Sequence, residues 1–346
     1  MYQNDIEKII NRQFDITTGL ATNLSLPKFK KYSVCNLRGG IGKTTLSFNL
    51  SYLADNILTL DTCPQGNLSY FFDDNYFNNY SITVKDLILP YLIPGLGKPT
   101  RCSTFVGSSN KWFANKNAFY IPSSDELYLL PSQLSTALHQ ASSLSSPQKE
   151  QAVANILYSL KSEVDREMAE NNLDKCLIDT SPFFSGATQL SWHASDALII
   201  PVRTDQQSIN SLELLINTLV NPSSEFRRYL PEMVTPKIHM IILTHCGWST
   251  VSGAQSKPNQ QTKVYIKKVY DLLNRHRNLL STNDPSNHLF LLDDFLGSGR
   301  ISSALSKPLE LLQAGETKTI DRVRVTVNQS VDKCKHELNY INRHLW

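Results

Sequence analysis

A glycine-rich turn between an apolar run and a helix-forming segment constrains this chain more than any other feature. Residues 32–45 read YSVCNLRGGIGKTT. Glycines let consecutive backbone N–H groups converge on phosphate oxygens, and the N-terminus of the following helix adds partial positive charge. In such a loop Lys43 reaches the β and γ phosphates, and the Thr44 hydroxyl binds Mg²⁺. The turn therefore predicts a nucleotide-binding loop, although Leu37 replaces the first glycine of the usual G-x-x-x-x-G-K-T pattern and the doublet Gly39-Gly40 supplies the flexibility.

Short aliphatic runs alternate with helix-length amphipathic stretches along most of the chain. This alternation is typical of a parallel sheet with helices on both faces. We expect one doubly wound α/β domain with a mostly parallel sheet of about seven strands. The expected strands are 32–36, 57–61, 126–130, 175–179, 197–202, 238–244 and 288–292.

Other segments predict the organisation around this sheet. Residues 1–30 read as a helical arm, and residues 31–346 as the main domain with an insertion at about 70–123. Residues 148–170 carry one apolar stripe at helical spacing, and so do residues from about 318 to 343. Residues 247–261 look like a flexible loop.

Composition leaves the partners of the chain open. Lys and Arg total 34 against 31 Asp and Glu, so a net charge of +3 supports at most a local basic patch. The longest apolar runs are far shorter than the roughly 20 residues that span a bilayer. Six separated cysteines without a C-x-x-C pair, and no visible secretory signal, lead us to expect a cytoplasmic protein with reduced thiols.

The phosphate loop and the segments after it resemble the ParA/MinD family of dimeric ATPases. Residues 38–44, RGGIGKT, resemble that family's deviant Walker A motif, K-G-G-x-G-K-T. Residues 60–67, LDTCPQGN, are similar to its D-x-D-P-Q-G-N element, and this favours the ParA branch. Residues 129–132 resemble its short strand before a helix, residues 176–182 its Walker B strand and switch, and residues 197–202 the strand that follows. The similarity covers roughly residues 31–343.

The resemblance implies ATP and Mg²⁺ as cofactors and assigns roles to individual residues. Asp61 and Asp179 would organise the metal together with Thr44, although an aspartate in such a place can also simply cap a strand end or helix. Arg38 stands where the family has a lysine that crosses the dimer interface to the partner's nucleotide. The residues expected around the phosphates are Arg38, Gly39, Gly40, Ile41, Gly42, Lys43, Thr44 and Thr45.

Cys63 occupies the place of the acidic residue that positions the attacking water in ParA relatives. A thiol is mostly neutral at pH 7 and is a weak hydrogen-bond acceptor. We therefore expect catalysis by Lys43, Arg38, Asp61 and Asp179 to be weak with Cys63 at this place, while ATP binding persists. His193 and His245 have no identifiable partner and read as core or surface histidines.

For function, the resemblance implies a homodimer that forms on ATP, binds DNA without sequence preference, and hydrolyses ATP when a ParB-like or other adaptor protein stimulates it. Such a protein is expected on the nucleoid. The DNA-binding surface would combine residues of two segments, unless these are ordinary solvated charges. They are Lys263, Lys267, Lys268, Arg275, Arg277, Arg322 and Arg324.

Two alternatives stay open. A scaffold could use ATP only to hold its dimer together, which the thiol of Cys63 would permit. A MinD-like protein could instead dock on a membrane through an amphipathic C-terminal helix, for which residues 338–346 supply apolar and aromatic side chains but few lysines. We expect no membrane partner as the main function.

Overall fold

The computed structural model describes residues 2–79, 82–184, 186–230, 232–251, 257–320 and 322–346. Within them, the centre of the molecule is a sheet of eight strands in the order β3-β4-β2-β5-β1-β6-β7-β8. All neighbours pair in parallel except β3, which runs antiparallel to β4 at the edge. The α/β prediction is confirmed, with one strand more than expected. The strands are β1 (Lys31–Val34), β2 (Ile57–Asp61), β3 (Thr104–Phe105), β4 (Ala118–Ile121), β5 (Lys175–Asp179), β6 (Ala197–Arg203), β7 (Lys237–Thr244) and β8 (Leu289–Leu291).

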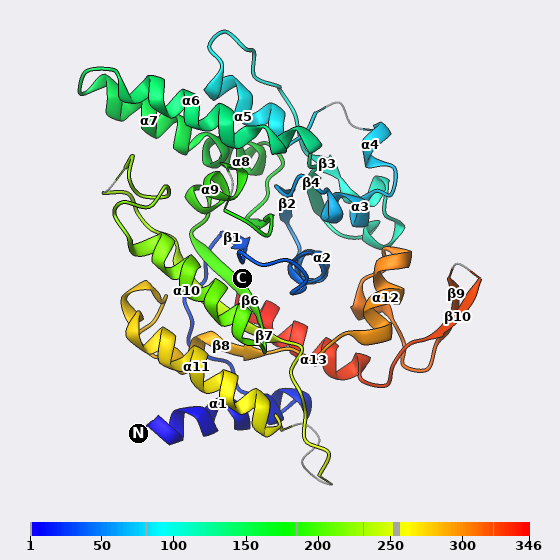
Figure 1. Ribbon diagram of the computed structural model, residues 1–346. Helices are drawn as coiled ribbons and strands as arrows, with labels where there is room; N and C mark the ends of the chain where they lie inside the picture. The colour runs from blue at the N-terminus through cyan, green and yellow to red at the C-terminus, as the bar shows by residue number, and fades with distance from the viewer. Residues whose placement is uncertain (1, 80–81, 185, 231, 252–256, 321) are drawn as a thin grey trace.

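Helices cover both faces of the sheet (Figure 1). The α-helices are α1 (Tyr2–Thr17), α2 (Lys43–Leu53), α3 (Asn67–Phe72), α4 (Tyr76–Asn79), α5 (Val84–Leu92), α6 (Leu130–Ser142), α7 (Gln148–Leu157), α8 (Ser159–Glu170), α9 (Gly186–Ala194), α10 (Gln206–Val220), α11 (Gln260–Arg275), α12 (Leu296–Leu305) and α13 (Val331–Arg343). Short 3₁₀ turns are η1 (Val106–Ser108), η2 (Lys111–Phe113), η3 (Asp125–Tyr128), η4 (Arg277–Leu279), η5 (Pro285–His288) and η6 (Leu309–Leu311). None of the described helices is both long and apolar enough to cross a bilayer.

The strands are buried on both sides, and alternate side chains enter different cores. Leu177 joins the cluster that contains Phe48 of α2 and Leu338 of α13. The neighbouring Ile178 joins the cluster formed by α5 to α9. Near-continuous apolar strands of this kind are expected in a parallel sheet that is covered on both faces.

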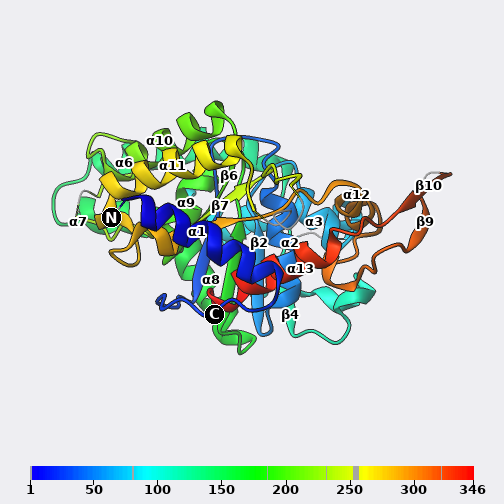
Figure 2. The same ribbon diagram turned by 90° about the horizontal axis from the view of Figure 1, so that it is seen from below.

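The N-terminal helix α1 covers the β8 edge of the sheet, where it lies beside α11 and α13 (Figure 2). Arg12 donates hydrogen bonds to the carbonyl oxygens of Ser286, at 2.9 Å, and Leu289. Its guanidinium also lies 5.2 Å from the centre of the Phe290 ring. The arm therefore covers a strand edge that would otherwise carry unpaired backbone groups.

The prediction of a strand at 126–130 is wrong. The comparison of residues 129–132 with the family's short strand before a helix is therefore wrong as well. This stretch forms η3 and the start of α6, because Ser124 accepts a hydrogen bond from the N–H of Glu126 and begins a helical turn. The strand that precedes α6 is β4, which pairs with β2. Both β3 and β4 arise from the segment predicted as an insertion. The single helix expected at 148–170 is two helices, α7 and α8, which meet at Tyr158.

The C-terminal helix expected at about 318–343 is also wrong over its first half. The strands β9 (Thr317–Ile320) and β10 (Val323–Thr326) pair antiparallel here, and α13 begins only at Val331. Val323, Val325 and the threonines favour strand, and their spacing fits a period of two as well as a helical stripe. The loop expected at 247–261 lies partly outside the described residues.

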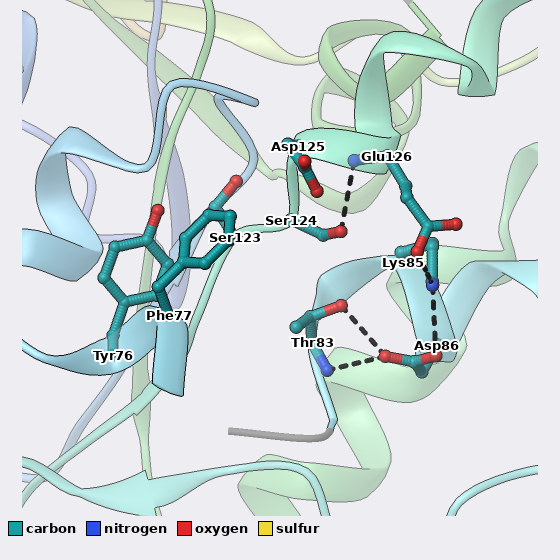
Figure 3. A pocket seen from close by; sticks show the side chains of 9 residues that line it. All are labelled: Tyr76, Phe77, Thr83, Lys85, Asp86, Ser123, Ser124, Asp125 and Glu126. Atoms are coloured by element: carbon teal, nitrogen blue, oxygen red, sulfur yellow. Dashed lines mark hydrogen bonds and ion pairs between the residues drawn. The ribbon is translucent and has the colours of Figure 1, made fainter. Parts of the chain in front are cut away.

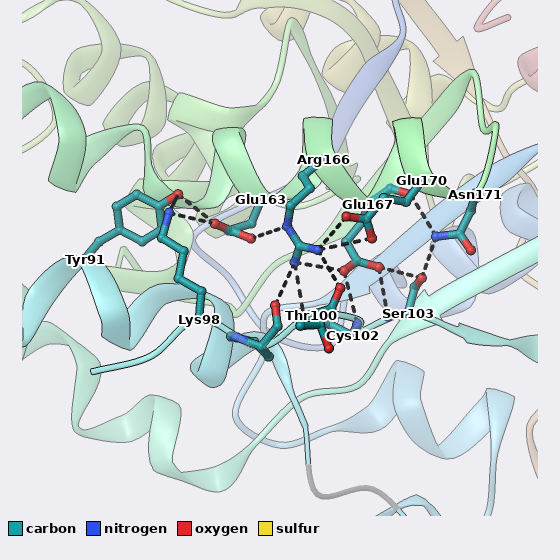
Figure 4. Close-up of polar contacts among 11 residues, drawn as sticks. Tyr91, Lys98, Thr100, Cys102, Ser103, Glu163, Arg166, Glu167, Glu170 and Asn171 are labelled. Atoms are coloured by element: carbon teal, nitrogen blue, oxygen red, sulfur yellow. Dashed lines mark hydrogen bonds and ion pairs between the residues drawn. The ribbon is translucent and has the colours of Figure 1, made fainter. Parts of the chain in front are cut away.

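A polar network fastens the segment before β3 to α8 (Figure 4). The buried carboxylate of Glu167 accepts hydrogen bonds from the N–H groups of Cys102 and Ser103, each at 3.1 Å, and from the Ser103 hydroxyl at 2.7 Å. Arg166 pairs with Glu163 at 2.8 Å. Since these buried charges are partnered, the network has a structural role.

Candidate nucleotide site at the carboxyl edge of the sheet

The glycine-rich loop joins β1 to α2 in the geometry that a phosphate cradle requires. Gly40 and Gly42 have φ of 69° and 88°, the left-handed region that side chains disfavour. Gly42 is also the N-cap of α2, so the free N–H groups of the first helical turn face the loop. The Lys43 ammonium, on a residue only 7% exposed, donates to the carbonyl oxygen of Arg38 at 2.7 Å. Burial lowers the pKa of Lys43, and the nearby Asp179 opposes this shift.

Asp179 lies at the end of β5, directly beside β1, and binds the first turns of α2. Its two carboxylate oxygens accept hydrogen bonds from the hydroxyls of Thr44 at 2.9 Å and Ser47 at 2.8 Å. Burial and the nearby charge of Asp61 raise the pKa of Asp179 to about 7. The hydrogen bonds from Ser47 and Thr44 lower this pKa, but by less. Sequence reasoning missed Ser47, although its position one turn after Lys43 placed it on the same helix face.

Asp61 ends β2 and pairs in register with Asp179, so the two carboxylates predicted from sequence lie on adjacent strands. Its oxygens accept hydrogen bonds from the N–H and the hydroxyl of Ser69, at 2.8 and 2.9 Å, and from the N–H of Cys63 at 3.1 Å. Burial raises the pKa of Asp61 to about 6. Asp61 therefore accepts hydrogen bonds from the first turn of α3. This is the contact expected of an aspartate that caps a helix.

The donor set fits Mg²⁺ best at Thr44 and Asp179. Among the described residues, no three His, Cys, Asp or Glu side chains gather as a protein-only metal site. Mg²⁺ commonly takes only one or two carboxylates and fills its shell with waters and substrate phosphates. A hydroxyl beside a carboxylate, facing a phosphate loop, matches that requirement. Asp61 lies beside Asp179 on the adjacent strand, but its two oxygens are already engaged by Ser69 and Cys63.

Cys63 lies in the loop between β2 and α3 and is 5% exposed. Burial, together with the charge of Asp61, raises the pKa of the Cys63 thiol to about 12, so the thiol is neutral at physiological pH. The hydroxyl of Ser123, just after β4, donates to the Cys63 carbonyl oxygen at 2.5 Å. The loop is therefore fixed to the neighbouring strand and presents no negative charge at this position.

A small polar pocket of about 180 Å³ lies next to this loop (Figure 3). Tyr76 and Phe77 form one wall, and Lys85, held by Glu126 at 2.7 Å, belongs to the other. Tyr76 also approaches Gly66 so closely that a Cβ there would lie 1.8 Å from the phenol oxygen. Gly66, with φ of 65°, is thus required both by its backbone and by this contact.

Arg38 lies on the opposite side of the loop, near α10. Its Nη1 donates to Asp205 and, at 2.7 Å, to the hydroxyl of Ser208. Asp205 is the N-cap of α10, where it accepts from the N–H of Ser208 at 2.9 Å. Burial opposes ionisation of Asp205, but these hydrogen bonds lower its pKa overall.

A larger cleft of about 670 Å³ opens beside the loop, between Gly40, Thr45 and α12. His245 lines it with φ of 55°, and its Nε2 lies 4.0 Å from a carboxylate oxygen of Asp294. Sequence reasoning did not find this cleft, because its walls come from segments about 200 to 260 residues apart. His193, in contrast, is buried and stacks on Phe226 at 4.6 Å, as a core histidine.

The structure does not bring the predicted DNA-binding residues together. Lys263, Lys267 and Lys268 lie on α11, whereas Arg322 and Arg324 lie on the β9–β10 hairpin. Both views place α11 and the hairpin at opposite ends of the molecule (Figures 1 and 2). Lys268 is engaged with Gln206 at 2.6 Å, and Arg322 is exposed with φ of 65°.

Comparison with known proteins identifies the family. A family model described as an AAA domain matches residues 29–230. An uncharacterised protein of Methanocaldococcus jannaschii is 27% identical over 191 residues, which are 54% of this chain and 64% of that protein. The chain therefore spans less than two thirds of the curated relative it matches.

Two solved structures of McdA from Cyanothece share the fold. An alanine variant in complex with ATP gives a TM-score of 0.54 at 20% identity over 80% of this chain and 87% of that one. The apo protein gives 0.53 at 20% identity over 80% and 90%. Since the family model matches more than half of the sequence, the chain belongs to the AAA domain family, and it shares its fold with the two McdA structures.

Proposed function

We propose that this chain is a ParA-like positioning ATPase that dimerises on binding ATP and then binds DNA without sequence preference. The observation that carries the proposal is the convergence of Lys43, Thr44 and Asp179 at one end of α2, beside a cleft of about 670 Å³. A helix N-terminus, a buried lysine and a hydroxyl–carboxylate pair are the groups that a nucleotide phosphate with Mg²⁺ requires. The cleft beside them has the volume for the nucleoside end of ATP.

In this proposal Lys43 exchanges its contact with the Arg38 carbonyl oxygen for a phosphate oxygen. Thr44 and Asp179 would hold Mg²⁺, which supplies charge neutralisation on the phosphates. Asp179 has to be ionised for this role, and the approach of a cation favours that form. Asp61 maintains the loop after β2 through Ser69 and Cys63.

We propose that hydrolysis is slow or depends on a partner. A neutral thiol at Cys63 neither orients a water firmly nor accepts its proton. Phosphoryl transfer depends mainly on positioning and charge stabilisation, so ATP binding need not suffer. An adaptor protein of the ParB kind would then supply what the loop lacks. A scaffold that hardly hydrolyses ATP is the second candidate, and the buried thiol favours it.

The DNA-binding part of the proposal needs the dimer. The α11 lysines and the hairpin arginines form two separate, small basic surfaces in one protomer. Weak surfaces that are linked in one dimer bind with greater avidity than either alone. Formation of the dimer on ATP would therefore convert weak contacts into retention on DNA.

The membrane alternative is disfavoured by the position of α13. Its apolar face is used inside the protein, where Leu338 and Ile341 belong to a core cluster. Leu345 is fully buried, and Trp346 packs edge-on against Tyr32 at 5.5 Å. An interfacial helix has to present such residues to lipid instead.

A DNA retention assay tests the proposal. Protein is incubated with non-specific duplex DNA and with ATP and Mg²⁺, ADP and Mg²⁺, or ATP and a chelator. We expect retention only with ATP and Mg²⁺, together with dimerisation in sedimentation. Nucleotide-independent retention, or binding of ATP without either response, would contradict it.

A further inference from the structure

The side chain of Arg38 is held at one nitrogen only. Its Nη1 donates both to the carboxylate of Asp205 and to the hydroxyl of Ser208, at 2.7 Å. Both partners belong to the beginning of α10, and Asp205 is itself fixed there as the helix N-cap. The anchor is therefore a rigid helix terminus and not a mobile surface group.

The other edge of the guanidinium is free. Across the residues that the structure describes, Nε and Nη2 of Arg38 have no hydrogen bond or ion pair, and 26% of the side chain is exposed. Nε and Nη2 point in parallel and form the fork that binds two oxygens of a phosphate at once. Arg38 also belongs to the phosphate loop, because its carbonyl oxygen accepts from Lys43.

We propose that Asp205, assisted by Ser208, is a positioning residue that holds Arg38 with its Nε–Nη2 edge turned to the nucleotide phosphates. The inference rests on the proposed function, since it assumes that Arg38 contacts the phosphates of its own or of the partner subunit's nucleotide. It adds the N-cap residue of α10, 167 positions after Arg38, to the phosphate site.

The anchor explains why arginine occupies position 38. A guanidinium has five donors in a plane, so two can be given to Asp205 and Ser208 while three remain for phosphate. An ammonium is a point charge, and a carboxylate beside it would draw the whole charge away from the phosphates. Arg38 and Asp205 are therefore a matched pair, in which each residue suits only the other.

A double-mutant cycle tests this pairing through the affinity for a fluorescent ATP analogue. Asp205→Asn removes the charge, yet its side-chain oxygen still accepts from the N–H of Ser208 and preserves the cap. We expect Asp205→Asn to lower affinity about tenfold in the wild-type background, the scale of a lost charged contact. In the Arg38→Lys background the same change should raise affinity, because it releases the ammonium. Arg228→Gln, which loses an exposed carboxylate contact of 3.5 Å to Glu225 and not to Asp205, is the control and should change little.

The direction in which Asp205→Asn changes the affinity for the ATP analogue in each background distinguishes the possible roles of Asp205. A loss in both backgrounds would mean that Asp205 only caps α10, and a gain in both would mean that it restrains Arg38. No change in either background would also overturn the inference. Ser208→Ala leaves Asp205 in place and should give a smaller loss, which keeps the test available if Asp205→Asn does not fold. Sedimentation of the wild type with ATP is a separate measurement. A monomer in that experiment would contradict the proposed dimerisation, whereas the affinity cycle tests the role of Asp205.

Discussion

The hydroxyl of Thr44 donates a hydrogen bond of 2.9 Å to Asp179, so the first turn of α2 is fastened to the end of β5. Ser47, three residues further along α2, donates to the other carboxylate oxygen of Asp179 at 2.8 Å. These two contacts set the position of the phosphate loop relative to the sheet. They also place the proposed metal ligands side by side, which makes the site testable residue by residue.

Lys43→Ala should weaken nucleotide binding by about 10- to 100-fold, because a charge-assisted hydrogen bond contributes about 1.5–3 kcal/mol. Titration with a fluorescent ATP analogue measures the loss. Lys30→Ala is the matched control, since Lys30 is exposed at the opposite end of β1 and its removal should leave affinity unchanged. Equal affinities for both variants would rule out the role of Lys43.

Cys63→Asp should raise the rate of ATP hydrolysis at saturating ATP by at least about tenfold, which corresponds to about 1.4 kcal/mol of transition-state stabilisation. The new carboxylate supplies the acceptor that the neutral thiol lacks. It should also lower the melting temperature, because Asp61 and Asp179 are already close by. Cys63→Asn has the same shape without the charge and serves as the control. Phosphate release that rises equally in both variants, or in neither, would show that charge at this position is not what limits the rate.

The two buried aspartates predict a pH dependence of stability. Burial raises the pKa of Asp61 to about 6 and of Asp179 to about 7, above the ordinary 3.8. Between the ordinary and the raised values the folded chain binds more protons than the unfolded chain, so the free energy of unfolding falls as pH rises. Asp179→Asn should remove its part of this decline, on the order of 3 kcal/mol between about pH 4 and 7.

Denaturant titrations of both proteins across this pH range measure the difference. The hydroxyls of Thr44 and Ser47 can accept as well as donate, so the amide retains hydrogen-bond partners. Parallel pH profiles for the wild type and the variant would contradict the prediction. Adding Mg²⁺ and ATP to the wild type should release protons over the same range, because the ionised form binds the metal.

Replacing the two hairpin arginines by glutamate should weaken DNA retention in the ATP state. Arg322→Glu with Arg324→Glu removes up to two phosphate contacts, and the salt slope should fall by about 2. The matched pair on α11, Lys267→Glu with Lys268→Glu, changes the same number of charges at the other end of the molecule. Since the two surfaces are far apart, the losses of DNA-binding free energy in the two variants should add in the combined variant. Retention that keeps its strength and salt slope would identify the hairpin arginines as solvated charges.

The sequence by itself determined the local geometry of the site. Backbone sterics predicted a tight turn at the glycines of the loop. The alternation of strand and helix predicted a helix that begins near the lysine and strands that end at the two aspartates. Because parallel strands end at one edge of a sheet, the order of the elements along the chain is enough to group these residues. The same reasoning placed β2 and β5, whose ends carry the two aspartates, at their observed bounds.

Only the tertiary structure decided the rest, because the contacts involved join residues far apart in sequence. The period of residues 317–326 fits a strand as well as a helix, and packing selected the hairpin. The capping of α3 by Asp61, and the separation of the α11 lysines from the hairpin arginines, depend on where whole elements are placed. The anchor between Arg38 and Asp205 spans 167 positions and leaves no periodic signal, so sequence indicated a cation in the phosphate loop while the fold decided what holds it.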